Sequence, residues 1–136
     1  MNSRDGKNWT RRALKNRINL YGIAHGNGLF VAVGDGDWIL TSLGGATWRA
    51  HRAPTSDVLL AAVAFSAGTF VVVGDSGTIL TSTNGIEWQK QNSGTSAHLN
   101  TVVPSPNGFV AAASGLAWTS PDGTTWTEHD FAVTNR

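Results

Sequence analysis

The sequence has no cysteine, little charge and no long apolar run. Without cysteine, disulfides, thiolate metal sites and cysteine nucleophiles are excluded, although secreted and cytosolic compartments both remain open. The longest apolar run, Val58 to Phe65, has eight residues, whereas a membrane-spanning helix needs roughly 20. No signal peptide is expected, because no apolar segment follows Met1 to Asp5. We therefore expect no membrane association, and the localisation stays unknown.

The small number of charged residues also limits which fold classes fit the sequence. Charged residues make up 14% of the 136 residues and hydrophobic ones 40%, and there are 16 glycines. Surface helices would carry more Lys and Glu, and a disordered chain would carry fewer apolar residues. The composition indicates a turn-rich β protein with the size of one ordinary domain.

The basic residues are concentrated near the N-terminus. Six of the ten lie within the first 17 positions, and against Asp5 alone they give the first 20 residues a charge of +5. Such a cluster can bind polyanions, but aromatic interleaving is limited to Trp9 and no nucleic-acid motif accompanies it. We interpret the segment as a solvated outer strand and do not expect a nucleic-acid partner.

Four tryptophans mark an internal repeat. They follow one another at intervals of 39, 40 and 38 residues, and each closes the phrase Ser-x-(Asp/Gly/Asn)-Gly-x-x-Trp, called the box below. A repeat near 40 residues built from short strands and Gly turns is typical of propeller blades. The box residues are Ser3, Asp5 and Trp9; Ser42 and Trp48; Ser82, Asn84 and Trp88; and Ser120, Asp122 and Trp126.

Each repeat contains the pattern of four short strands. Second strands such as Phe70 to Val73 are apolar on both faces, as expected between neighbouring sheets, and fourth strands are polar, as expected on the outside. Gly-rich turns such as Gly26-Asn27-Gly28 separate the strands. We expect first strands at 19–25, 59–65 and 99–103, second strands at 29–33, 69–73 and 109–113, third strands at 38–42, 78–82 and 116–120, and fourth strands beginning at each box Trp.

The pattern predicts an all-β fold of propeller blades, each with four antiparallel strands. Three full blades are expected per chain, preceded by one extra N-terminal strand. The expected units are an isolated outer strand with the first box at 1–18, blade 1 at 19–57, blade 2 at 58–96 and blade 3 at 97–136.

The boxes resemble the Asp-box, or bacterial neuraminidase repeat, whose fuller form is Ser-x-Asp-x-Gly-x-Thr-Trp. The repeat sequence outside the box, Phe70 to Asp75 followed by Gly77 to Ser82, is similar to the repeats of propellers related to photosystem assembly factors. The resemblance covers nearly the whole chain, although each box is one residue shorter and Gly44 and Asn84 replace the Asp in two copies. It implies that the box is a structural turn between third and fourth strands, on the face away from the ligand site.

The residue inventory does not support a sialidase. The resemblance implies that such an enzyme would need an arginine triad, a Tyr nucleophile with a Glu base, and an Asp acid. The one tyrosine, Tyr21, lies within a first strand, while Glu87 and Glu128 flank box tryptophans. We expect no catalytic residues, no enzyme activity and no cofactor. No metal site is expected, because the histidines lack metal-ligand spacing.

Three blades cannot comfortably close a ring, and an open arc would expose an apolar sheet face at each end. We expect assembly of the chain with itself: a homodimer with six blades is preferred, and a trimer with nine is the alternative. The spare N-terminal strand could exchange with a neighbour's last blade. Equally, the start within a repeat favours a natural or engineered fragment of a longer propeller.

Binding on the top face is the expected role. This face is formed by the connections into first strands and the turns from second to third strands, and its polar groups beside an aromatic suit a glycan or a protein. Taken singly, Trp38 and Trp118 fit core packing between blades better than ligand binding, and Asp35 and Asp37 fit turn capping better. A purely structural fragment without ligand is the second hypothesis, and a sialidase-like remnant the third. The candidate ligand residues are Asp35, Asp37, Trp38, Asp75, Ser76, His98, Asn100 and Ser114.

Overall fold

The computed structural model describes residues 19–55 and 58–130, and they form three four-stranded antiparallel sheets. The first sheet contains β1 (Leu20–Gly26), β2 (Leu29–Gly34), β3 (Trp38–Ser42) and β4 (Arg49–Arg52). The second contains β5 (Leu60–Ser66), β6 (Thr69–Gly74), β7 (Ile79–Ser82) and β8 (Gln89–Gln91). The third contains β9 (Thr101–Ser105), β10 (Gly108–Ala113), β11 (Leu116–Ser120) and β12 (Thr127–Asp130).

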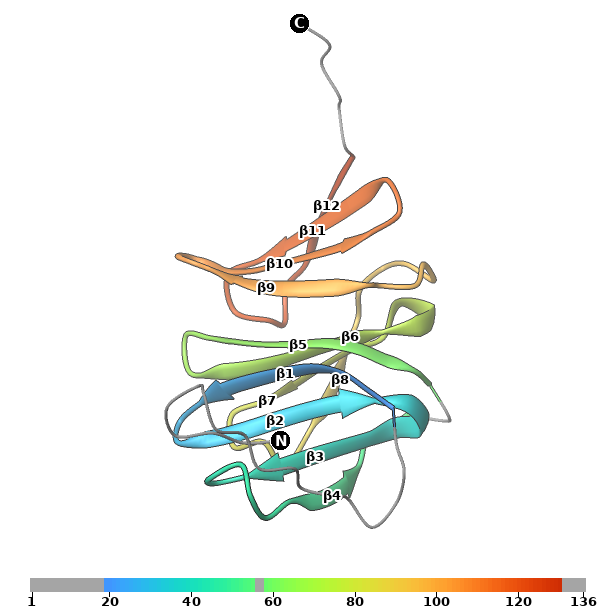
Figure 1. Ribbon diagram of the computed structural model, residues 1–136. Helices are drawn as coiled ribbons and strands as arrows, with labels where there is room; N and C mark the ends of the chain where they lie inside the picture. Colours follow the sequence, from blue (N-terminus) through green and yellow to red (C-terminus); the bar gives the residue numbers. More distant parts are fainter. Residues whose placement is uncertain (1–18, 56–57, 131–136) are drawn as a thin grey trace, which may run out of the picture.

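Each sheet is a simple meander, because strands that follow one another in sequence pair side by side. The sheets are called blades 1, 2 and 3 below, and Figure 1 shows them stacked in chain order. The all-β fold class with three four-stranded sheets is thereby confirmed. The expected N-terminal strand and its box residues Ser3, Asp5 and Trp9 lie outside the described residues.

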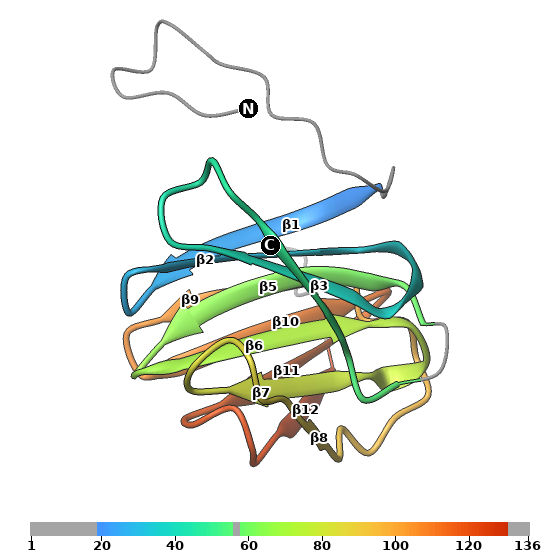
Figure 2. The ribbon, with the colours of Figure 1, turned by 90° about the horizontal axis from the view of Figure 1, so that it is seen from below.

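The first strands lie together and the fourth strands lie at the outer edges. β5 contacts both β1 and β9, so the first strands of successive blades are neighbours. Figures 1 and 2 show the strands of all three blades lying along nearly the same axis, with neighbouring strands alternating in direction. The turns from second to third strands therefore gather at one end, the top face. The hairpins between first and second strands gather at the other end with the box turns, and this end is the box face.

Two apolar clusters lie between the blades. One joins blades 1 and 2 through residues such as Val31, Val63 and Phe70, and the other joins blades 2 and 3 through residues such as Val71 and Trp118. Packing of sheet faces against each other removes these side chains from water, the main stabilising term. Trp118 is 1% exposed, and its indole N–H has no partner among the described residues.

Some strand boundaries differ from the expected ones. β9 begins at Thr101 rather than at Leu99, because the N–H of Leu99 donates to the Gly74 carbonyl of the preceding blade at 3.0 Å. β7 begins after Thr78, whose N–H donates to Asp75 O and closes the preceding turn. In the three described boxes, the fourth strand begins one residue after the Trp, because the indole N–H of this Trp bonds within the turn.

The box glycines lie directly against the preceding blade. Gly85 and Gly123 have φ of 78° and 88°, the left-handed region that glycine tolerates best. A Cβ on Gly123 would lie 2.9 Å from Val71 Cγ2 and 3.3 Å from Thr81 Cγ2, both in blade 2. Glycine is therefore required twice over, by the backbone conformation and by the closeness of the neighbouring blade.

Among the described residues, no helix is long or apolar enough to cross a membrane; the only helical segments there are two 3-10 turns, η1 (Asp35–Asp37) and η2 (Asp75–Gly77).

Gly123→Ala should destabilise the protein far more than Gly28→Ala. Gly28 has a similar φ of 73° but no atom within 4 Å of an added Cβ, so it isolates the cost of the backbone conformation. We expect about 1 kcal/mol for Gly28→Ala and roughly 3 kcal/mol for Gly123→Ala, because the β-branched Val71 cannot easily move aside. Urea unfolding of both variants measures the difference. An equal decrease in the free energy of unfolding in the two variants would contradict the packing of the preceding blade against Gly123.

Candidate binding sites on the two ends of the blades

The box turns on the box face are held by hydrogen bonds within the box. In blade 2, Ser82 Oγ accepts from the N–H of Gly85 at 2.8 Å, and the Trp88 indole N–H donates to the Gly85 carbonyl at 3.0 Å. In blade 1, the N–H of Gly45 donates to Ser42 Oγ and the indole of Trp48 to the Gly45 carbonyl. These contacts tie each Ser and Trp to the intervening glycine.

Asp122 and Asn84 both accept backbone hydrogen bonds within their box turns, although only Asp122 is charged. Asn84 Oδ1 accepts from the N–H groups of Ile86 and Glu87, both at 2.9 Å. Asp122 Oδ1 accepts from those of Thr124 and Thr125, at 2.9 and 3.1 Å. The backbone bonds from Thr125 and Thr124 lower the pKa of Asp122 from 3.8 to about 2. Gly44 stands at this position in blade 1 and cannot accept such bonds.

Asp35 organises the top of blade 1. Its carboxylate accepts from Asn19 Nδ2 at 3.1 Å and from the Tyr21 hydroxyl at 3.0 Å. The hydrogen bond to Asp35 is the main reason why the pKa of Tyr21 is raised above its usual value. The sequence predicted Asp35 as a ligand residue but missed Asn19 and Tyr21, which lie 16 and 14 positions away.

Asp37 and Trp38 have structural contacts. Asp37 is 6% exposed, and its Oδ1 accepts from the Thr55 hydroxyl and the N–H of Val58, both at 2.7 Å. It therefore fixes the connection into blade 2. Trp38 is half-buried, and the guanidinium carbon of Arg52 lies 4.8 Å from its ring centroid, a cation–π contact.

The top of blade 2 brings together three of the expected residues. The N–H of Ser76 donates to His98 Nδ1 at 3.1 Å, and Asp75 Oδ1 lies 3.4 Å from the same nitrogen. Asn100 and Ser114 of blade 3 are exposed, and Asn100 bonds through its backbone N–H to Ala112 O at 2.8 Å.

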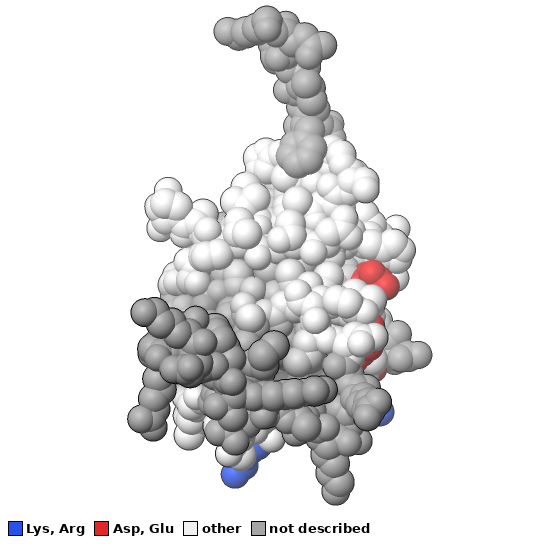
Figure 3. Space-filling model, viewed as in Figure 1, with Lys and Arg blue, Asp and Glu red and all other residues white. Residues whose placement is uncertain are grey.

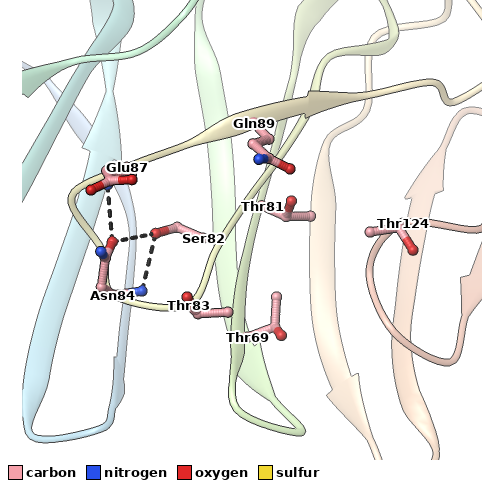
Figure 4. A pocket seen from close by; sticks show the side chains of 8 residues that line it. All are labelled: Thr69, Thr81, Ser82, Thr83, Asn84, Glu87, Gln89 and Thr124. Atoms are coloured by element: carbon pink, nitrogen blue, oxygen red, sulfur yellow. Dashed lines mark hydrogen bonds between the residues drawn. The ribbon is translucent and has the colours of Figure 1, made fainter.

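A polar cleft lies on the box face between blades 2 and 3 (Figure 4). It has a volume of about 280 Å³, and only Glu87 is charged among the described residues that line it. Thr124 reaches it from the box of blade 3, and the other lining residues belong to blade 2: Thr69, Thr81, Ser82, Thr83, Asn84, Glu87 and Gln89. The sequence interpretation assigned the box face to structure alone and missed this cleft.

The two outermost sheet faces carry exposed apolar side chains. On blade 1, Ile23 is 60% exposed, whereas Val63 at the matching position of blade 2 is 7% exposed because it packs between blades 1 and 2. On blade 3, Val103 is 48% exposed, whereas the matching Ala64 is 3% exposed. Figure 3 shows that the described surface on one side of the molecule carries very few charged side chains.

Among the described residues, no group of three or more His, Asp or Glu side chains could hold a metal ion.

No model of a known protein family matches the chain, and no curated protein matches it. Several solved chains are similar in fold. One of them is YCF48 from Cyanidioschyzon merolae, with a TM-score of 0.73 and 22% identity over 88% of this chain and 42% of that one. Another is YCF48 bound to D1 peptide, with a TM-score of 0.70 and 17% identity over 86% and 44%. The chain thus spans less than half the length of these structures.

Both of these structures are β-propellers, so the propeller part of the expected resemblance is confirmed. At these identities the likeness concerns the fold.

Asp122→Asn should leave stability at neutral pH nearly unchanged and reduce acid sensitivity. The amide oxygen can accept the same backbone bonds, as Asn84 does in blade 2. Because the folded pKa of Asp122 lies below its unfolded value, its carboxylate stabilises the fold above about pH 4 and loses this effect as the pH falls towards 2. Solvent screening limits the difference to about 1 kcal/mol. Chemical unfolding of both proteins at pH 7 and pH 3 measures this difference in the free energy of unfolding. If both proteins lose the same stability between pH 7 and pH 3, the stabilising role of the Asp122 carboxylate is contradicted.

Proposed function

We propose that this chain is a non-catalytic propeller module whose blades join further blades in a ring, and whose assembled ring binds a protein partner. One observation carries the assembly: the outward face of blade 3 has the same chemistry as the faces that blades 1 and 2 bury. The proposed blade units are 19–57, 58–96 and 97–136, with the boxes as Asp-box-like turns.

The outward face of blade 3 resembles the face that blade 2 buries, although Ala112 and Ala117 stand there in place of Val73 and Ile79. Val71 and Thr81, which contact the box glycine of blade 3, correspond to Val110 and Thr119. Side-chain hydrogen bonds recur as well. Gln91 Nε2 donates to Thr81 Oγ1 at 3.0 Å, and His129 Nε2 lies 2.9 Å from Thr119 Oγ1. Blade 3 is therefore equipped to receive another blade.

The outward face of blade 1 repeats the opposite surface. Phe65 and Phe70 of blade 2 pack against blade 1, with ring centroids 4.7 Å apart. His25 and Phe30 occupy the matching positions in blade 1, with centroids 4.4 Å apart. The two ends are thus complementary to each other rather than to themselves, so copies would join head to tail. A dimer with six blades remains the preferred ring and a trimer with nine the alternative.

A protein is the partner that the comparisons favour. One of the similar structures is of YCF48 bound to D1 peptide, so a propeller with this fold binds a segment of another protein. A glycan on the top face is the second candidate. The exposed polar groups Ser76 and His98 favour it, together with the half-buried Asp35 and Trp38.

Assembly is tested by the mass of the protein in solution. Light scattering should give twice the mass of one chain for the dimer, or three times for the trimer. Val103→Lys should shift the population to monomers, because it places a charge on the outward face of blade 3. Leu43→Lys is the matched control, since Leu43 is 82% exposed in a box turn away from both end faces. A well-folded wild-type monomer would rule out a ring of identical chains and favour a segment of a longer propeller.

The glycan alternative is tested by thermal unfolding in the presence of a sugar library. A ligand that binds the native protein raises its melting temperature, by several degrees at concentrations well above its dissociation constant. We expect no sugar to do so. A reproducible increase that is lost in Trp38→Ala would replace the protein-partner proposal with a glycan-binding one.

A further inference from the structure

Three of the residues that line the cleft differ in chemistry from their equivalents one repeat earlier. The cleft has Thr69, Thr83 and Thr124, and the equivalent positions 40, 40 and 38 residues before them hold Leu29, Leu43 and Ile86. Three apolar side chains at one junction are thus replaced by three hydroxyls at the next.

This replacement is not required by blade packing. Both junctions place a box glycine against the preceding second strand, with Gly85 beside Leu29 and Gly123 beside Val71. Of the three positions that differ, the one with Leu29 and Thr69 is half-buried, and Leu29 packs against the cluster between blades 1 and 2. The other two lie at the rim, where Leu43 and Ile86 are 82% and 58% exposed and Thr83 and Thr124 are exposed too. Rim residues contribute little to the buried clusters, so their polarity is free to serve recognition.

The cleft is rich in hydrogen-bond acceptors and carries a negative charge. Threonine hydroxyls and the Gln89 amide oxygen can accept hydrogen bonds, and Glu87 adds a carboxylate. Glu87 is fixed at its backbone, where its N–H donates to Asn84 Oδ1 at 2.9 Å. Figure 4 shows Thr124 on the opposite side of the cleft from Asn84 and Glu87. No basic side chain is among the described residues that line it.

We propose that this cleft binds the guanidinium group of an arginine side chain from a protein partner. A guanidinium presents five N–H donors in one plane, which matches a carboxylate flanked by neutral acceptors better than the compact ammonium of lysine does. The inference rests on the proposed protein-binding function, because it names the chemistry of the bound segment. The cleft is built within one chain, between blades 2 and 3, so it does not depend on ring assembly.

The test is an NMR titration of the full chain with Nα-acetyl-arginine N-methylamide. The matched probe is Nα-acetyl-citrulline N-methylamide, which has a similar shape but no charge. We expect saturable shifts of the backbone amides of residues 83–89 and Thr124, with a dissociation constant on the order of millimolar, as for one exposed group. Citrulline should bind more weakly by about two- to fivefold, the range of an exposed ion pair.

Two substitutions locate the site. Glu87→Gln should weaken arginine binding by about two- to fivefold, whereas Glu128→Gln, which removes an equally exposed carboxylate from β12, should not change it. Thr124→Ile restores the residue type of the other junction and should abolish the shifts. The amide spectrum of each variant verifies its fold, since all three side chains are exposed.

Equal binding of both probes, shifts confined to other residues, or an unchanged affinity in Glu87→Gln would each overturn the proposal. The mass measurement is independent of this titration. If a monomeric protein binds arginine, the proposed arginine site is supported and the proposed ring is rejected. If the protein assembles but does not bind arginine, the ring is supported and the arginine site is rejected.

Discussion

The contact between a box glycine and the preceding blade is the constraint on which the described structure depends. It requires the left-handed conformation of Gly85 and Gly123 and the absence of a Cβ in the same place. The hydrogen bonds of Ser, Asn or Asp and Trp within the box serve to present that glycine. The boxes of blades 2 and 3 are therefore both local turns in their own blade and packing elements for the blade before them.

Much of the fold could be predicted from the sequence, because its causes are local and repeated. Spacing of the tryptophans, alternation in the strands and glycines in the turns each report on a few neighbouring residues. The boundaries that shifted depend on contacts between blades. Leu99 leaves its expected strand because its N–H bonds to Gly74 of another blade, and no local pattern contains that information.

The candidate sites were less accessible to sequence reasoning. Asp37 was expected among ligand residues, yet it is buried and bonds to Thr55 and Val58, because its backbone conformation turns the carboxylate towards the connection between blades. The bond of Tyr21 to Asp35 joins β1 to η1, which are separated in the sequence by β2, so no local pattern predicts it. The polar cleft did leave a signal: aligned repeats show Leu29 against Thr69 and Ile86 against Thr124. The residues shared by all repeats indicate the fold, whereas those that differ between repeats indicate the cleft.

The principal contacts between blades join blades that are also neighbours in the chain. Stability in such an array is close to a sum over units and their interfaces, so an added unit leaves the existing interfaces intact. Duplication of about 40 codons would supply a new strand face and a new glycine together, already matched to each other. The left-handed glycine thus makes the fold extensible. Each duplicated repeat carries both the box glycine that packs against the preceding blade and the sheet face against which the next blade packs.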